Sequence, residues 1–171
     1  MTLNYDSMLE WFLSVFGFVV KTIDDLPALE GTEDVRIYHM HGYIPNPEFS
    51  DKRSNFVILS RDAVNKKLGT RDEPWTEKLR EILESGVCLF IGLSGRTLSD
   101  YAVAPFFRTC GEIVSKTRPL GVWLLAKEDL PESKRKEFHR SNIVPIRLED
   151  YDDIPEFILK VCQAATLEIR K

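Results

Sequence analysis

The chain has 171 residues, of which 43% are hydrophobic and 29% charged, and its formal net charge is −4. These values are typical of a soluble globular protein with a single domain and a sizeable core. The acidic balance gives no electrostatic basis for binding nucleic acid or an anionic membrane surface, so we expect neither as a partner.

Strand-like and helix-like segments alternate along the chain. In chain order we predict a helix over 6–16 capped by Asp6, strands over 18–24 and 35–42, a strand running into a helix over 55–64, a helix over 74–85, a strand over 87–92, a helix over 101–114, a strand over 121–126, a short helix over 131–140, a strand over 143–148 and a closing helix over 154–169. This alternation predicts an α/β fold with a mostly parallel sheet.

Two of the expected strands, 87–92 and 121–126, are unbroken apolar runs bounded by glycine. Such runs are typical of parallel strands buried on both faces. We therefore expect these two strands to be adjacent and central in the sheet, with helices on both of its faces.

The apolar opening segment and the cysteines indicate the cellular setting. The segment 8–20 is interrupted by Glu10, is too short to span a bilayer, and lacks the basic leader of a signal peptide. Cys88, Cys110 and Cys162 are widely spaced and no CxxC pair occurs, so neither a zinc module nor a disulfide framework is expected. The expected location is the cytoplasm.

Ligands of open parallel sheets bind outside the carboxyl ends of the strands, which makes three stretches candidate sites. These are "TLNYD" at the start, "HMHG" over 39–42 and "GLSG" over 92–95. The last offers glycine for close backbone approach and the Ser94 hydroxyl, but such a stretch after a buried strand is more often just a tight strand-to-helix turn. Neither a Walker loop, nor GxGxxG, nor GxSxG occurs.

Two of the three histidines, His39 and His41, fall within three residues and would share one face of a strand. A metal site would need a third ligand, and none is obvious nearby, so we expect no metal. His39 fits a packed, hydrogen-bonded core residue. His41 directly precedes Gly42, where the strand should end, and an imidazole that titrates near neutrality suits a general base. Spacing alone leaves both a structural and a catalytic role open for His41.

Several stretches together resemble the sirtuin-like NAD-consuming (NADase) family, most closely its zinc-free bacterial branch linked to phage defence. They are "TLNYDSMLEWFL", "VRIYHMHGYIP", "VILSRDAV" and "PWTEKLREILESGVCLFIGLS", which stand in the family's order over roughly residues 2–94, and more weakly the tail "SNIVPIRLEDYDDIPEFILKV". The resemblance implies a Rossmann-like single domain over 1–171. It implies that this domain corresponds to the C-terminal two-thirds of the family domain and lacks its N-terminal Gly-rich strand–loop–helix.

The resemblance also assigns roles by position. Asn4 would orient the nicotinamide ribose and the attacking water, with Asp6 in support. His41, placed before Gly42, would be the general base that acts at the ribose.

The "GLS" stretch would complete the cofactor site, since Gly92 and Ser94 would lie against the adenosine ribose. Cleaving the nicotinamide–ribose bond builds oxocarbenium character, for which a positioned amide, a base and a water suffice without metal. NAD is therefore the implied substrate, and nicotinamide and ADP-ribose are the implied products.

Two functional classes stay open. The first is an NAD hydrolase of bacterial anti-phage defence, with weak NAD affinity for this chain alone because the diphosphate-holding loop is missing. The second is a non-catalytic remnant or interaction module completed by another chain. An apolar surface near Leu3, Phe12 and Phe16 is expected in either case, and it predicts a homo-oligomer or a partner chain. A deacylase ranks third, because three isolated cysteines cannot form the four-cysteine zinc module of that class.

Overall fold

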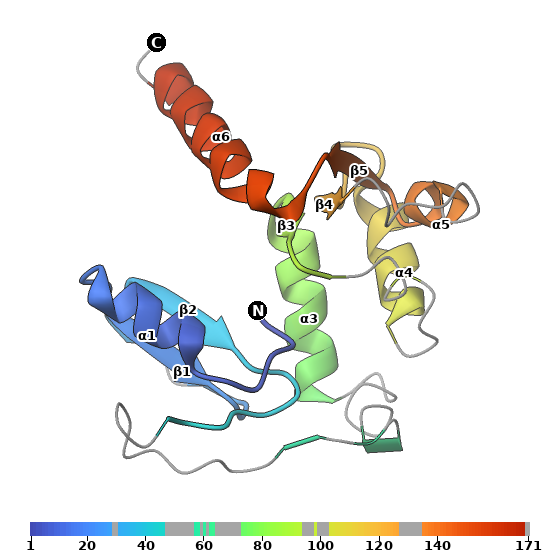
Figure 1. The fold of residues 1–171 in the computed structure, drawn as a ribbon. Coiled ribbons are helices and arrows are strands. Elements are labelled where there is room, and N and C mark those ends of the chain that lie inside the picture. The colour runs from blue at the N-terminus through green and yellow to red at the C-terminus, as the bar shows by residue number, and fades with distance from the viewer. Residues whose placement is uncertain are drawn as a thin grey trace. The chain divides into compact units, whose positions relative to one another are not determined.

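The computed structural model describes residues 1–28, 31–46, 57–58, 60, 62–63, 73–93, 98, 103–126 and 135–169. They belong to two compact units, Met1–Lys78 and Leu79–Lys171 (Figure 1). The predicted helices and strands lie within these ranges except for most of 55–64 and the first residues of 101–114 and 131–140, which fall outside the described residues.

The first unit contains a short parallel sheet with a helical connection. Helix α1 (Met8–Val15) precedes strands β1 (Val20–Ile23) and β2 (Val35–Tyr38), which pair in parallel (Figure 1). A parallel bridge between Thr2 and His39 adds the N-terminal segment beside the end of β2. Helix α1 therefore connects the N-terminal segment to β1, and the chain between Ile23 and Val35 connects β1 to β2.

Helix α1 begins one residue later than its predicted cap suggests. Its N-cap position is Ser7, while the Asp6 carboxylate accepts a hydrogen bond of 3.1 Å from the Met8 amide. Asp6 thus still satisfies one of the amides that a helix start leaves unpaired. The helix buries Glu10, and its apolar side chains Phe12 and Phe16 are 54% and 65% exposed, as expected for the apolar surface.

The second unit is built around a three-stranded parallel sheet in the order β3-β4-β5. Helix α3 (Pro74–Ser85) begins in the first unit and continues into the second. After it come β3 (Cys88–Phe90), α4 (Ala104–Val114), β4 (Gly121–Ala126), α5 (Arg135–Arg140), β5 (Ile143–Leu148), a 3-10 turn η4 (Tyr151–Asp153) and α6 (Ile154–Ile169). The α/β class with parallel strands is confirmed and is consistent with a Rossmann-like fold.

The two apolar runs are neighbours in this sheet, but they are not equally buried. β4 is central, and Trp123, Leu124 and Leu125 have no exposed surface. β3 lies at the edge of the sheet that the described residues form, and Val87, Leu89 and Ile91 beside and within it are 54%, 45% and 43% exposed. The prediction of burial on both faces is confirmed for β4 and wrong for β3.

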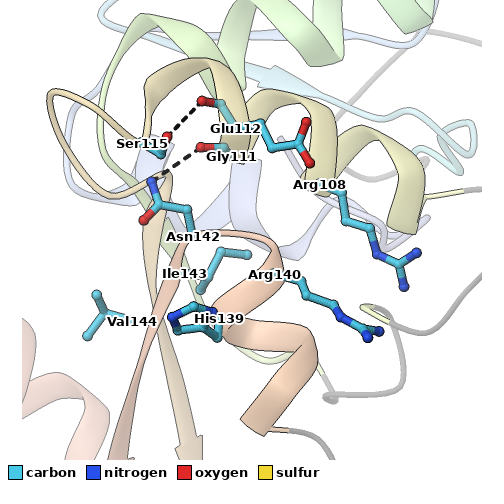
Figure 2. Close-up of a pocket in the computed structure, with 9 residues that line it drawn as sticks. All are labelled: Arg108, Gly111, Glu112, Ser115, His139, Arg140, Asn142, Ile143 and Val144. Carbon is cyan, nitrogen blue, oxygen red and sulfur yellow. Dashed lines mark hydrogen bonds between the residues drawn. The ribbon is translucent and has the colours of Figure 1, made fainter.

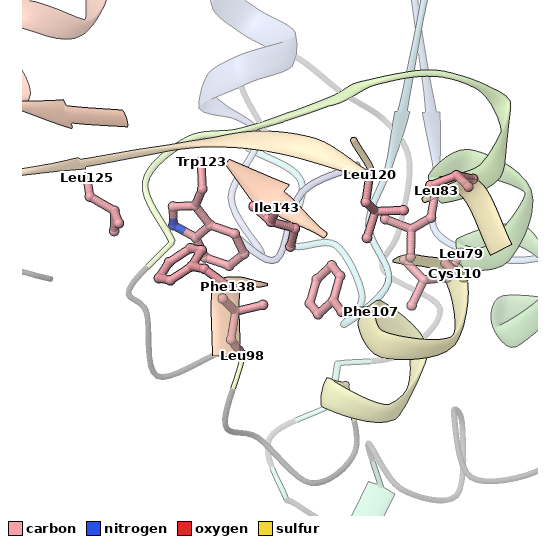
Figure 3. Close-up of a cluster of buried hydrophobic side chains, with 11 residues drawn as sticks. Leu79, Leu83, Leu98, Phe107, Cys110, Leu120, Trp123, Leu125, Phe138 and Ile143 are labelled. Carbon is pink, nitrogen blue, oxygen red and sulfur yellow. The ribbon is translucent and has the colours of Figure 1, made fainter. Parts of the chain in front are cut away.

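The core of the second unit surrounds the Trp123 indole (Figure 3). Phe90 stacks on it at 4.8 Å between ring centroids, and Phe107 and Phe138 meet it edge-on at 6.2 and 5.6 Å. The indole N–H donates to the Leu93 carbonyl at 2.9 Å, so the one polar group of this side chain is satisfied inside the core.

Cys110 in this core is expected to be chemically inert. Burial, together with the Glu84 carboxylate beside it, raises the pKa of its thiol to about 11. Because the thiolate is the nucleophile, Ellman's reagent at neutral pH should label exposed Cys162 fast and Cys110 only after unfolding. Because Cys88 is only half-buried, the decisive variant replaces both Cys88 and Cys162 by serine, and fast labelling that persists in it would contradict this prediction.

The same pKa shift predicts a direction for stability at alkaline pH. The folded state keeps the Cys110 proton in a range where the unfolded chain, with an ordinary pKa of 9.0, has lost it. This contribution is complete below the unfolded-state pKa and is lost as the pH rises toward 11. Urea midpoints measured on either side of this range should therefore fall with pH, and less so in Cys110→Ala.

Candidate functional site

The N-terminal segment holds Asn4 beside the end of β2. The Thr2 amide donates to the Tyr38 carbonyl at 2.9 Å, and the Asn4 amide donates to the Thr2 hydroxyl at 3.1 Å. Tyr5 holds the segment through two further hydrogen bonds. Its carbonyl accepts from the Ile44 amide at 2.6 Å, and its hydroxyl donates to the Ile58 carbonyl. The Asn4 backbone is fixed while its side chain is exposed.

His41 lies in a turn that ends the strand earlier than expected. β2 stops at Tyr38, and the Gly42 amide donates back to the His39 carbonyl at 3.1 Å. Gly42 has φ of 100°, a conformation that favours glycine because it has no Cβ. The predicted strand alternation therefore does not extend to His41, which is half-buried with its ring 6.1 Å from that of Tyr5.

The N-terminal segment places Asn4 and His41 in the same region, beside the end of β2. The Asn4 carbonyl oxygen is 2.9 Å from Nδ1 of His39, two residues before His41, and the ring of the next residue, Tyr5, is 6.1 Å from that of His41. Asn4, Asp6, His41 and Gly42 thus all belong to the first unit and to the region where the N-terminal segment passes the end of β2.

Two hollows flank the exposed Asn4 side chain. One of about 410 Å³ lies along α1, and one of about 480 Å³ lies against the 44–46 stretch. Asn4 and Asp6 line both hollows, and His41 is not among the described residues that line either. A carboxamide and a carboxylate between two hollows suit the hydroxyls of a sugar, since both side chains accept hydrogen bonds and the amide also donates them.

His39 lies beneath these groups and is fully buried. Its Nδ1 is 2.9 Å from the Asn4 carbonyl oxygen, its Nε2 contacts a carboxylate oxygen of Glu10, and the Tyr43 ring packs edge-on against it at 4.8 Å. The expectation of a packed, hydrogen-bonded core histidine is confirmed. Burial and the nearby Glu10 and Asp24 carboxylates raise the pKa of Tyr43.

Glu10 lies next to the candidate site and was not singled out from the sequence. The signal for it was present, because an acidic residue in the middle of an apolar helical segment needs a partner if the helix packs against a sheet. Glu10 is 7% exposed and lies next to the chain's most deeply buried histidine.

The predicted adenosine site is in the second unit. Gly92 follows β3 with φ of 70°, is exposed, and has open space where a Cβ would stand. Ser94 lies outside the described residues. The contact of these two residues with a ribose stays a prediction.

A larger hollow of about 720 Å³ lies between α4, α5 and the start of β5 (Figure 2). Three of its polar side chains are engaged: Arg108 and Arg140 pair with Glu137 at 2.7 and 2.9 Å, and Asn142 donates to the Gly111 carbonyl at 3.4 Å. The two arginines hold the pKa of the Glu137 carboxyl below its usual range. We interpret this hollow as structural.

The part of the chain that the structure describes contains neither a metal-binding cluster nor a membrane-spanning helix. No group of three or more His, Cys, Asp or Glu side chains is arranged to hold a metal ion there. No helix among these residues is both long and apolar enough to cross a membrane.

An α/β fold with parallel strands, polar side chains at a strand end and a histidine–glycine turn defines the class of protein. The chain belongs to the SIR2-like domain family, whose model matches residues 1–146. No curated protein sequence matches it significantly. The resemblance to the sirtuin-like family is thus confirmed at the level of the family over residues 1–146, and most of the quoted tail stretch, 141–161, lies beyond the matched residues.

Proposed function

We propose that this SIR2-like domain cleaves NAD to nicotinamide and ADP-ribose, in the manner of the zinc-free bacterial defence branch and in the cytoplasm. The observation that carries the proposal is the pairing of the N-terminal segment beside the end of β2, with Asn4 between two hollows and its neighbour Tyr5 against the ring of His41. SIR2-like domains use NAD, so a site with sugar-binding groups in this family favours NAD as the substrate.

The proposed reaction consumes one water. The bond between nicotinamide and C1 of the ribose breaks, the electron pair leaves with nicotinamide, and water adds to C1. Asn4 holds the ribose and the water, Asp6 supports it, and His41 accepts the proton that the water loses. Gly92 and Ser94 would contact the adenosine ribose of the same NAD molecule.

A second candidate function rests on the exposed face of α1. Met8, Phe12, Val15 and Phe16 are all more than half exposed, and contiguous apolar surface of this kind marks interfaces. We propose that a second copy or a partner chain covers this face. A non-catalytic interaction module would use the same face of α1 and would not cleave NAD.

The test is incubation of the purified chain with millimolar NAD, at a concentration high enough to compensate for weak affinity. Nicotinamide and ADP-ribose should appear in equal amounts, and Asn4→Ala should abolish both. Light scattering over a concentration series reports self-association in the same samples. Absence of products at every concentration, with self-association retained, would reject the hydrolase and leave the interaction module.

A further inference from the structure

Glu10 and His39 connect α1 to the backbone of Asn4 through one buried chain of hydrogen bonds. The Glu10 carboxylate contacts Nε2 of His39, and Nδ1 of the same ring is 2.9 Å from the Asn4 carbonyl oxygen. We infer that Glu10 is a positioning residue that acts through His39 to fix the Asn4 carboxamide at the ribose. This inference rests on the proposed function of the Asn4 site.

The chemistry of the contacts fixes where the protons are. A carbonyl oxygen only accepts hydrogen bonds, so Nδ1 of His39 must carry a proton and donate it to Asn4. On the other side, Nε2 and the Glu10 oxygen share one more proton. With the second proton on either atom, Nδ1 keeps its own proton, so Glu10 favours the forms of the imidazole that keep the bond to Asn4.

Burial makes this bond effective as a constraint. His39 has no exposed surface and Glu10 is 7% exposed, so water does not compete for either contact. The backbone N–H of Asn4 separately donates to the Thr2 hydroxyl at 3.1 Å. With both backbone polar groups of Asn4 engaged, its Cα–Cβ bond points in a fixed direction between the two hollows.

The pair is poorly suited to a purely stabilising role. The second oxygen of Glu10 is buried and has no hydrogen-bond partner among the described residues. A buried carboxylate with one unpaired oxygen lowers stability relative to a well-packed apolar residue. His39 also accepts the Gly42 amide on its carbonyl, so one buried residue supports both Asn4 and the turn that carries His41.

The experiment compares Glu10→Ala, Glu10→Gln and the control Glu112→Ala, which removes an exposed glutamate of α4. Glu10→Ala should lower kcat for NAD about 100-fold with little change in KM, since a displacement of about 1 Å can cost that much. Glu10→Gln should retain most of the activity. Its side-chain amide can donate to Nε2, so Nδ1 keeps its proton and still donates it to the Asn4 carbonyl. A folded Glu10→Ala with wild-type kcat, or a Gln variant as impaired as the Ala variant, overturns the inference.

Nitrogen NMR separates this inference from the proposed function. In the wild-type chain, Nδ1 of His39 should have the shift and proton coupling of a protonated nitrogen, and an unprotonated Nδ1 overturns the inference even if the variants do not fold. If the wild type fails to cleave NAD, the proposed function is rejected. The NMR signals of the Asn4 side-chain amide then test the positioning role separately. Signals that shift in Glu10→Ala and return to their wild-type positions in Glu10→Gln support this role, and signals that do not shift refute it.

Discussion

Replacing His41 by alanine is expected to lower the kcat of NAD cleavage by about 10²- to 10⁴-fold, the usual contribution of a general base. This corresponds to roughly 3–5 kcal/mol of transition-state stabilisation. KM should change little, because the imidazole acts on the water and not on the rest of NAD. The physical basis is the Gly42 turn, which follows β2 and holds His41 near the N-terminal segment that carries Asn4, with the Tyr5 and His41 rings 6.1 Å apart.

The matched control is His139→Ala, which removes an exposed histidine on α5 in the second unit. It should leave kcat and KM at wild-type values. The wild-type kcat/KM should fall as the pH is lowered through the range where imidazoles gain a proton, since a base must be unprotonated. An active wild type whose His41→Ala variant keeps its kcat would remove His41 from the mechanism.

Trp123→Ala is expected to cost about 3–5 kcal/mol of unfolding free energy, the range for truncating a large buried aromatic side chain. The indole has no exposed surface and packs against three aromatic rings, so its loss leaves a cavity that these rings cannot fill without leaving their own contacts. The Leu93 carbonyl also loses its donor. Since a whole domain is stable by only about 5–15 kcal/mol, this is a large share.

Urea unfolding followed by circular dichroism measures this effect. Trp11→Ala is the control, because Trp11 lies on α1 and is 43% exposed, and its loss should shift the midpoint much less. The shift of the urea midpoint in Trp123→Phe should lie between those of Trp123→Ala and Trp11→Ala. Equal midpoint shifts for Trp123→Ala and Trp11→Ala would show that the aromatic cluster does not hold the second unit together.

Local patterns in the chain determined much of this protein. The unbroken apolar run of β4 predicted a buried central strand, since such a run is typical of a strand covered on both faces. The glycine after His41 predicted a break in the strand, and Gly42 does take a backbone conformation that other residues avoid, although β2 already ends four residues earlier, at Tyr38. The order of the motifs was sufficient to indicate the family.

Other features depend on which segments meet in space, and only the tertiary structure decided them. The apolar run of β3 resembles that of β4, but its place at the sheet edge leaves alternate side chains exposed. Glu10 interrupts an apolar helix in the sequence, and its meaning depends on His39, which is 29 positions away. Periodicity reports which residues share a face, but the partner that covers that face is set by long-range packing.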